Sequence, residues 1–268
     1  MPSGTACHLV RFRLAGCGRD PTLLPMPDAG PAPLLSIVIP VKNEESTIPG
    51  LSAEISRTFA DAPFPWEAVW INDGSTDRTA DLLRNLPAPH RFLAFDRNHG
   101  QSAAFMAGFE SARGEWVGTL DGDGQNDPAD LRRQLDHALA TGVDLVNGIR
   151  AKRQDSIIRK ISSKIGNGVR NWLTGETVTD VGCSTRVCRR AALLRLPFFH
   201  GMHRFLPTLV RMRGFTIAEI PVNHRPRAGG ASKYGVLNRV FAATRDLFGV
   251  RWLISRSRVW TITETNQR

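Results

Sequence analysis

The sequence has few cysteines and no long apolar run, and each shortage counts against a class of protein. Its four cysteines, Cys7, Cys17, Cys183 and Cys188, form no C-x-x-C pair in 268 residues. This number and spacing disfavour a disulfide-rich secreted scaffold and a zinc site, so we expect a reducing compartment. No apolar stretch reaches the roughly 20 residues that a transmembrane helix needs.

The segment before residue 34 lacks the continuous apolar core of a signal peptide. It is rich in Pro and Gly, so residues 1–33 are predicted to be disordered or to be an over-extended start, because Met26 lies just before the first strand signal. After it, we predict a globular domain over residues 34–233 and a basic amphipathic segment over residues 234–268.

Charge is distributed unevenly along the chain. Residues 1–148 contain 12 Lys and Arg against 19 Asp and Glu, a net charge of −7. Residues 149–268 contain 23 against 6, a net charge of +17, which brings the whole chain to +10. The asymmetry indicates that the second part faces an anionic partner, such as a phosphate, a lipid headgroup or a nucleic acid. An Arg-rich composition without functional meaning is the alternative.

Apolar runs alternate with segments of helical character in the first 150 residues. The runs that predict strands are 34–41, 66–73, 92–96, 115–121 and 144–149. This alternation predicts an α/β fold with a mostly parallel, doubly wound sheet. Ligands bind at the carboxyl ends of the strands in such sheets. We therefore expect one site at that edge, built from the polar side chains that follow the strands: Asp73, Asp96, Arg97, Asp121, Asp123 and Arg150.

The stretch TLDGDGQNDP, residues 119–128, places several oxygen donors in a Gly-rich turn. Asp121 and Asp123 are two residues apart, and Gln125 can add a neutral oxygen. Such donors suit a hard cation, Mg²⁺ or Mn²⁺, and Mg²⁺ usually takes one or two protein carboxylates together with substrate phosphates. A calcium EF-hand is excluded, because the positions that require Gly and Glu hold Asn and Arg. The turn is therefore predicted to bind a metal together with a diphosphate.

Two later segments combine helical spacing of apolar residues with many basic ones. Residues 156–173 and 234–254 each carry an apolar stripe, several Arg or Lys, and a tryptophan, Trp172 or Trp252. We predict basic amphipathic helices there. They are either surface helices that cover the protein's own core or interfacial helices at a membrane.

Four ordered motifs resemble those of family 2 glycosyltransferases, which have the GT-A fold. They are SIVIPVKNEESTI, INDGSTDRT, RNHGQSAAFMAGFESARGEWVGTLDGDGQNDP and HRPRAGGASKYG. The resemblance covers residues 34–250 and is greatest to the dolichyl- and polyprenyl-phosphate sugar synthases. It implies that the domain over residues 34–233 has a nucleotide-sugar and metal half, 34–148, and an acceptor half, 149–233.

The resemblance also implies roles for the residues that match the family's motifs. Those expected to bind the nucleotide sugar are Pro40, Asn43, Glu44, Asp73, Gly74, Ser75, Arg97, Asn98 and Gly100. The expected metal ligands are Asp121, Asp123 and Gln125. The catalytic group is expected to comprise Asp121 and Asp123 with four cations that hold phosphates, Arg150, Arg159, Arg227 and Lys233. Ser232 lies in the same loop as Lys233 and is expected to bind substrate.

The sequence departs from the family pattern in two places. Gly122 and Gly124 stand where Ala and Leu are more usual, which predicts a more mobile turn. The C-terminal transmembrane pair of many relatives is missing from this sequence, which calls integral membrane insertion into question but leaves the transfer chemistry intact.

Together these features predict an inverting, metal-dependent glycosyltransferase that uses Mg²⁺ or Mn²⁺. The expected substrates are a UDP- or GDP-linked sugar and a polyprenyl phosphate, and the expected location is peripheral, on the cytoplasmic face of the cell membrane. A phosphate acceptor is already ionised at neutral pH, so catalysis depends on positioning and on charge neutralisation. The identity of the sugar and of the polyprenol stays open.

Two other functions are compatible with parts of the sequence. A GT-A enzyme that acts on a saccharide or lipid hydroxyl in cell-envelope polysaccharide synthesis needs a carboxylate base. Asp180 is the best candidate for that base, and its alternatives are a turn residue or the partner of a nearby Arg. A nucleic-acid-binding module is a remote reading, because the cationic half lacks interleaved aromatic residues despite a pI near 10.4. His99, His203 and His224 are predicted to be structural or to contact substrate.

Overall fold

The computed structural model describes residues 32–150, parts of 168–175, 178–225 and 236–259, with only the backbone for 236–243. From Pro31 onward the chain forms one compact unit. The expectations for residues 1–31, and those for Arg159, Arg227, Ser232 and Lys233, lie outside the described residues. None of the described helices combines the length and the apolarity that crossing a bilayer requires.

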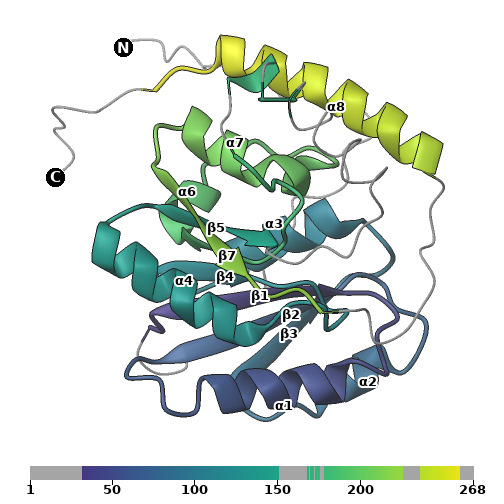
Figure 1. Cartoon of the computed structure of the whole chain (residues 1–268). Helices are drawn as coiled ribbons and strands as arrows, with labels where there is room; N and C mark the ends of the chain where they lie inside the picture. The colour runs from purple at the N-terminus through teal and green to yellow at the C-terminus, as the bar shows by residue number, and fades with distance from the viewer. Residues whose placement is uncertain are drawn as a thin grey trace, which may run out of the picture. The chain divides into compact units, whose positions relative to one another are not determined.

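A seven-stranded sheet forms the centre of the described unit, in the order β3-β2-β1-β4-β6-β5-β7 (Figure 1). Its strands are β1 (Leu35–Val41), β2 (Trp66–Asn72), β3 (His90–Ala94), β4 (Trp116–Thr119), β5 (Leu145–Arg150), β6 (Arg186–Arg189) and β7 (Ile217–Val222). All run in one direction except β6, which is antiparallel to its neighbours β4 and β5. The five predicted strands correspond to β1–β5, and the mostly parallel sheet confirms the predicted fold class.

Helices cover both faces of this sheet, so side chains on alternate strand positions are buried on opposite sides. In β1, Leu35, Ile37 and Ile39 pack on one face, and Val38 packs on the other. The first face is covered by α1 (Ile48–Thr58), α2 (Thr79–Arg84) and α4 (Pro128–Thr141). The second is covered by α3 (Gln101–Ser111), α6 (Arg190–Leu193), the 3₁₀ helix η1 (Met202–Phe205), α7 (Leu206–Met212) and α8 (Val236–Arg256).

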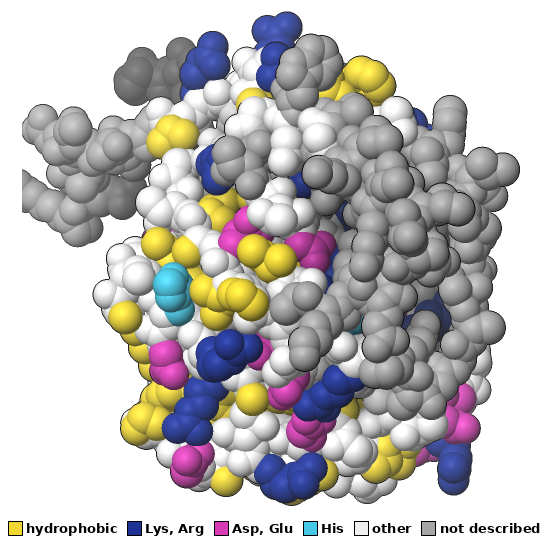
Figure 2. Space-filling model, viewed as in Figure 1, with side chains coloured by type: hydrophobic (Ala, Val, Ile, Leu, Met, Phe, Trp, Pro, Cys, Tyr) yellow, Lys and Arg dark blue, Asp and Glu magenta, His cyan; other side chains and the backbone are white. Residues whose placement is uncertain are grey.

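The last helix, α8, lies where the sequence predicted a helix and has one buried and one exposed side. Leu247 and Val250 belong to the core of the second face. Phe248 and Trp252 are 61% and 60% exposed. Figure 2 shows basic and hydrophobic side chains together along the upper edge, where Figure 1 places α8. Large aromatic side chains therefore face solvent next to positive charge.

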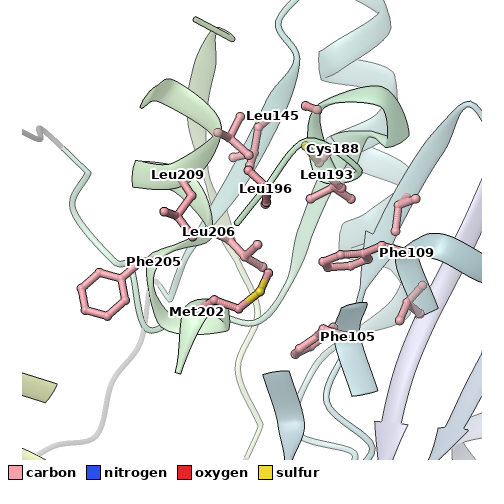
Figure 3. Packing of buried hydrophobic residues seen from close by; sticks show 14 of the residues in the cluster. Phe105, Phe109, Leu145, Cys188, Leu193, Leu196, Met202, Phe205, Leu206 and Leu209 are labelled. Carbon is pink, nitrogen blue, oxygen red and sulfur yellow. The ribbon is translucent and has the colours of Figure 1, made fainter. Parts of the chain in front are cut away.

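The core of the second face joins α3 to the elements that follow β6. Phe105 and Phe109 of α3 stack on each other with ring centroids 5.8 Å apart. They belong to the same buried cluster as Met202, Leu206 and Leu209 of η1 and α7 (Figure 3). The predicted nucleotide half and acceptor half thus share one hydrophobic core.

A buried carboxylate, Glu67, lies near the amino-terminal end of β2. It is 1% exposed and accepts hydrogen bonds from Ser36 Oγ at 2.6 Å, Arg91 Nε at 2.8 Å and Arg113 Nε at 3.0 Å. Burial alone would raise the pKa of Glu67, but the hydrogen bonds from Arg91, Ser36 and Arg113 outweigh it and lower the pKa to about 2. This cluster fastens β1, β2 and β3 together at the edge opposite the predicted site.

Candidate active site

Four loops leave the carboxyl ends of neighbouring strands and meet at one edge of the sheet. They follow β1, β2, β3 and β4 and cover residues 42–47, 73–78, 95–100 and 120–127. Because β1, β2, β3 and β4 are parallel, loops that are far apart in the sequence lie side by side. The structure therefore brings the predicted site residues from Pro40 to Gln125 to a common edge.

The loops after β1 and β2 are hydrogen-bonded to each other. The Asn43 N–H donates to Ser75 Oγ at 3.0 Å, and the Thr76 N–H donates to Asn43 Oδ1 at 2.8 Å. The Glu44 N–H donates to Thr79 Oγ1 at 3.0 Å. Asn43 has a positive φ of 54°, a conformation that Asn tolerates better than most residues. Asn43, Glu44 and Ser75 thus belong to two loops that are hydrogen-bonded to each other, and their binding to a nucleotide stays a prediction.

Asp73 organises the next loop with its side chain. Its buried carboxylate accepts hydrogen bonds from Asn98 Nδ2 at 2.8 Å, from the His99 N–H at 2.7 Å and from the Gly100 N–H at 3.0 Å. These neutral donors fix the start of α3 without cancelling the negative charge of the carboxylate. Contact between Asp73 and a nucleoside stays a prediction, because the bonds described here hold the loop.

The acidic turn after β4 is tied to the same loop. Gln101, the first residue of α3, donates from Nε2 to Asp121 Oδ1 at 2.9 Å. Within the turn, the Gln125 N–H donates to Asp123 Oδ1 at 3.1 Å, and the Asp121 N–H donates to Asn126 Oδ1 at 3.1 Å. Three predicted motifs, at Asp73, at residues 97–100 and at the acidic turn, are therefore connected by direct contacts.

The two unusual glycines of the acidic turn have separate structural reasons. A Cβ on Gly122 would lie 2.4 Å from Val41 Cγ1 and 2.9 Å from Pro40 O, so the turn passes directly against the end of β1. Gly124 has a φ of 74°, which L side chains rarely adopt. Close packing and local geometry account for both glycines, and greater mobility of the turn stays a prediction.

The surroundings of Asp121 disfavour its charged form, whereas those of Glu67 favour its charged form. Burial and the neighbouring charge of Asp123 raise the pKa of Asp121, while a hydrogen bond from Ser184 and the more distant charges of Arg186 and Arg150 oppose the rise. A cation placed between the two carboxylates would relieve their repulsion. The turn therefore favours a positive ligand.

The donor set of the turn fits Mg²⁺ or Mn²⁺. Two carboxylates and an amide, from Asp121, Asp123 and Gln125, are the hard oxygen donors that these ions prefer. No cluster of three or more His, Cys, Asp or Glu side chains that could hold a metal occurs among the described residues. A cation at this turn would complete its coordination with further oxygens, from water or from a substrate such as a diphosphate.

Arg150, at the end of β5, is held by Asp180. Its Nε and Nη2 each donate to the Asp180 carboxylate at 2.7 Å, and both side chains are mostly buried. A Cβ on Gly182 would lie 2.9 Å from Arg150 Nη2, so the loop packs closely over the guanidinium. Of the interpretations offered for Asp180, this geometry favours the partner of an Arg over a free catalytic base.

Arg186 is a buried cation near the site that sequence reasoning missed. It is 4% exposed and donates to Asn147 Oδ1 at 2.9 Å, to Val181 O at 2.7 Å and to His203 O at 3.2 Å. All three acceptors are neutral, so the positive charge is not cancelled by direct contact. Its position in a short strand with arginine at both ends gave no periodic signal of burial.

His203 and His99 each contact a neighbouring side chain. His203 Nδ1 lies 2.7 Å from Ser102 Oγ, and burial lowers the pKa of His203 to about 3, so it is neutral at physiological pH. His99 Nε2 lies 2.7 Å from Asp96 Oδ1 at the surface. Ser102 lies in the first turn of α3, so His203 links η1 to the edge of the site. These contacts support structural roles.

A mostly parallel sheet with a D-x-D turn at the carboxyl ends of its strands is the arrangement of the GT-A fold. The model of the family named Glycosyl transferase family 2 matches residues 36–196. This chain belongs to that family. The match includes every described residue of the predicted site.

Two curated relatives show which members of the family this chain is similar to. The chain is 40% identical over 213 residues to the undecaprenyl-phosphate 4-deoxy-4-formamido-L-arabinose transferase of Pectobacterium carotovorum, a match that covers 77% of this chain and 64% of the relative. It is 34% identical over 227 residues to the dodecaprenyl-phosphate galacturonate synthase of Rhizobium johnstonii, covering 82% of this chain and 67% of the relative. The chain thus spans about two thirds of the length of these relatives.

Solved structures share the fold at low sequence identity. Glucosyl-3-phosphoglycerate synthase from Mycobacterium tuberculosis, solved with Mn²⁺, UDP-glucose and phosphoglyceric acid, has a TM-score of 0.62 at 17% identity, covering 87% of this chain and 88% of that chain. Mannosyl-3-phosphoglycerate synthase from Rubrobacter xylanophilus has a TM-score of 0.63 at 17% identity, covering 88% and 79%. The likeness shows a common fold.

Proposed function

We propose that this chain transfers a sugar from a nucleoside-diphosphate sugar to a polyprenyl phosphate. The observation that carries the proposal is the connected edge of the sheet, where Asp73, residues 97–100 and the turn with Asp121 and Asp123 contact one another. Relatives named for undecaprenyl- and dodecaprenyl-phosphate sugar transfer support this acceptor. A UDP- or GDP-linked donor is supported by the UDP-glucose complex of a protein with the same fold.

The acidic turn would hold Mg²⁺ or Mn²⁺ through Asp123 and Gln125, with Asp121 beside them. When bound, the cation would neutralise charge on the diphosphate of the donor. The bond between Asp73 and Gly100 keeps the loop over residues 95–100 in place. Asn43 and Ser75 lie in the two hydrogen-bonded loops that would contact the nucleoside. The chain thus provides separate supports for the nucleoside and for the diphosphate.

The transfer itself is a single displacement with inversion. An oxygen of the lipid phosphate forms a bond to the anomeric carbon as the bond from that carbon to the diphosphate oxygen breaks, and the nucleoside diphosphate leaves with the electron pair. The attacking phosphate is already an anion, so no side chain has to remove a proton. The proposed cations around the two phosphates are Arg150, Arg159, Arg227 and Lys233, with Ser232 as a further substrate contact.

A hydroxyl acceptor would need a carboxylate base, and the geometry counts against the best candidate. Asp180 accepts two hydrogen bonds of 2.7 Å from Arg150, one on each carboxylate oxygen, which fix its orientation. The phosphate acceptor is therefore the better explanation of this site.

We place the enzyme peripherally at the cytoplasmic face of the membrane, with α8 at the lipid surface. Nucleotide sugars are intracellular metabolites, whereas a polyprenyl chain lies in the bilayer. The exposed side of α8 carries Phe248 and Trp252 among exposed arginines, Arg245, Arg251 and Arg256. Aromatic rings at the headgroup level and positive charge near anionic lipid both favour such docking.

Contacts of Gly201, the residue that precedes η1, support this placement, because they connect α8 to the site. A Cβ on Gly201 would lie 2.6 Å from Asp246 Oδ2 of α8. The Gly201 N–H donates to Ser102 Oγ at 2.9 Å, at the start of α3. Through Gly201, α8 is therefore connected to the start of α3, which follows the loop that Asp73 holds.

The function is tested with radiolabelled UDP- and GDP-sugars, Mn²⁺ and one of two acceptors, undecaprenyl phosphate or undecaprenol. Label is expected in a lipid-phosphate sugar with the first acceptor alone. Label in undecaprenol, or in neither lipid across the common sugar donors, would contradict the proposal. A DNA-binding assay on the same preparation is expected to show no specific complex.

Membrane docking is tested by co-sedimentation with vesicles that contain anionic phospholipid. The double variant Phe248→Ser with Trp252→Ser is expected to lose most binding, whereas Leu139→Ser, which changes an exposed leucine on α4, is expected to bind as the wild type does. Equal binding by both variants, or a dimer in solution that the double variant dissociates, would overturn the role of α8.

A further inference from the structure

Arg225, just beyond β7, joins the acidic turn to two helices. Its guanidinium pairs with Glu54 of α1 at 2.8 Å and with Asp127, the N-cap of α4, at 3.0 Å. The Glu54 and Asp127 side chains are 26% and 18% exposed, so both pairs are partly shielded from solvent. A planar guanidinium that contacts two carboxylates restrains its own backbone as well as both partners.

The backbone of the same residue is bonded to the acidic turn. The Arg225 N–H donates to Gln125 O at 2.9 Å, and Gln125 Nε2 donates to Arg225 O at 3.2 Å. The neighbouring residues Asn126 and His224 form an antiparallel bridge. Gln125 is therefore held by Arg225 through both its main chain and its side chain.

These bonds decide which end of the Gln125 amide is available to a ligand. With Nε2 donating to Arg225 O, the other terminal atom, Oε1, is the acceptor that remains, and none of the described contacts uses it. A hard cation binds an amide through its oxygen. Groups outside the ligand shell that orient a ligand contribute strongly to metal affinity.

We infer that Arg225 is a positioning residue for the metal site. Its pairs with Glu54 and Asp127 hold residues 224–225 against the turn, and this contact keeps the Gln125 oxygen available to a cation bound by Asp121 and Asp123. The inference rests on the proposed function, which supplies the metal. It adds a requirement for an arginine that touches neither metal nor substrate and that is 100 residues away from the glutamine it positions.

A purely structural role for Arg225 would consist of fastening α1 to α4, and the chain offers a matched control for that role. Arg132 of α4 pairs with Asp61 at 2.7 Å and donates to Thr58 O, at the end of α1, at 3.4 Å. It joins the same two parts of the fold without any described contact to residues 121–126. Arg132→Ala therefore removes a comparable surface pair and leaves the turn unchanged.

The test measures Mn²⁺ binding to the full chain by electron paramagnetic resonance in the presence of UDP, with GDP in a parallel series. Arg225→Ala is expected to weaken Mn²⁺ binding about ten-fold, the lower end of the effects seen for outer-shell groups. Arg225→Lys is expected to retain part of the affinity, and Arg132→Ala to match the wild type. Because Arg225 acts through Gln125, the double variant Arg225→Ala with Gln125→Ala is expected to bind no more weakly than Gln125→Ala alone.

The outcomes separate this inference from the function on which it rests. A wild-type protein that binds no Mn²⁺ with either nucleotide contradicts the metal part of the proposed function and removes the inference with it. A wild type that binds Mn²⁺, with Arg225→Ala within two-fold of it or with fully additive effects of the two substitutions, overturns the inference alone. If Arg225→Ala does not fold, Glu54→Gln weakens the same anchor with Arg225 in place and is expected to lower affinity by a smaller factor.

Discussion

Glu67 and Asp121 are acids at opposite ends of the parallel strands of one sheet, and their surroundings move their pKa values in opposite directions. Glu67 is bonded directly to Arg91 and Arg113, and its pKa falls to about 2. Asp121 is half-buried beside Asp123, accepts a hydrogen bond from the Gln101 amide, and has a raised pKa. Glu67 fastens strands through two bonded arginines, whereas none of the described contacts gives Asp121 a directly bonded cation, so a positive ligand would favour its charged form. The contrast separates a carboxylate that stabilises the fold from one that lies in the predicted site.

The largest effect is expected from a substitution in the acidic turn. Asp123→Ala is expected to reduce kcat/KM for sugar transfer by about 10³-fold or more, because the charge that binds the cation is halved. The melting temperature is expected to stay close to that of the wild type, since removing one of two repelling carboxylates costs the fold little. Metal-dependent turnover at the wild-type rate would show that the turn is not the metal site.

At the opposite edge, the same kind of change is expected to affect stability instead of activity. Glu67→Gln leaves Arg91 and Arg113 without their common counter-ion in a mostly buried position and is expected to lower the free energy of unfolding by about 3–5 kcal/mol. Urea denaturation measures the loss. Asp81→Asn, at the exposed pair with Arg84, serves as the control and is expected to change stability by less than about 1 kcal/mol. Equal losses in the two variants would remove the contrast between the edges.

Acid titration sharpens the comparison further. Because the folded-state pKa of Glu67 lies below its ordinary value of 4.5, its contribution to stability is full above pH 4.5 and is lost as the pH falls toward about 2. The raised pKa of Asp121 acts with the opposite sign, since protonation of Asp121 relieves strain in the folded state. Unfolding free energies from pH 5 to pH 2 are therefore expected to fall less steeply in Glu67→Gln than in the wild type, and more steeply in Asp121→Asn.

The smallest expected effect concerns the geometry of the turn. Gly124→Ala places a side chain at a φ of 74° and is expected to lower stability by about 1 kcal/mol. Thermal unfolding by circular dichroism detects this as a small shift of the melting temperature. A variant as stable as the wild type would show that the left-handed conformation does not constrain residue 124.

Much of the fold was readable from the sequence because local patterns specify it. Apolar runs located β1–β5, and the D-x-D spacing located Asp121 and Asp123. An Arg partner for Asp180 was one of the alternatives, but its identity as Arg150 and the pairing of Arg225 with Glu54 were not readable, because each pair joins residues that only the sheet topology brings together. β7 gave no usable signal, since most of its side chains are only partly buried.

The antiparallel strand β6 makes the two predicted halves inseparable. Within the described sheet it alone supplies the hydrogen bonds between β4 and β5, and so between the block β3-β2-β1-β4 and the pair β5-β7. During synthesis β5 emerges before β6, so the side of β4 that pairs with β6 stays unpaired until Arg186–Arg189 is synthesised. A fragment that stops at residue 148 would keep that edge open, and open edges invite aggregation. The nucleotide half and the acceptor half therefore cannot be exchanged as modules, and any attempt to shorten or shuffle this enzyme has to carry β6 along.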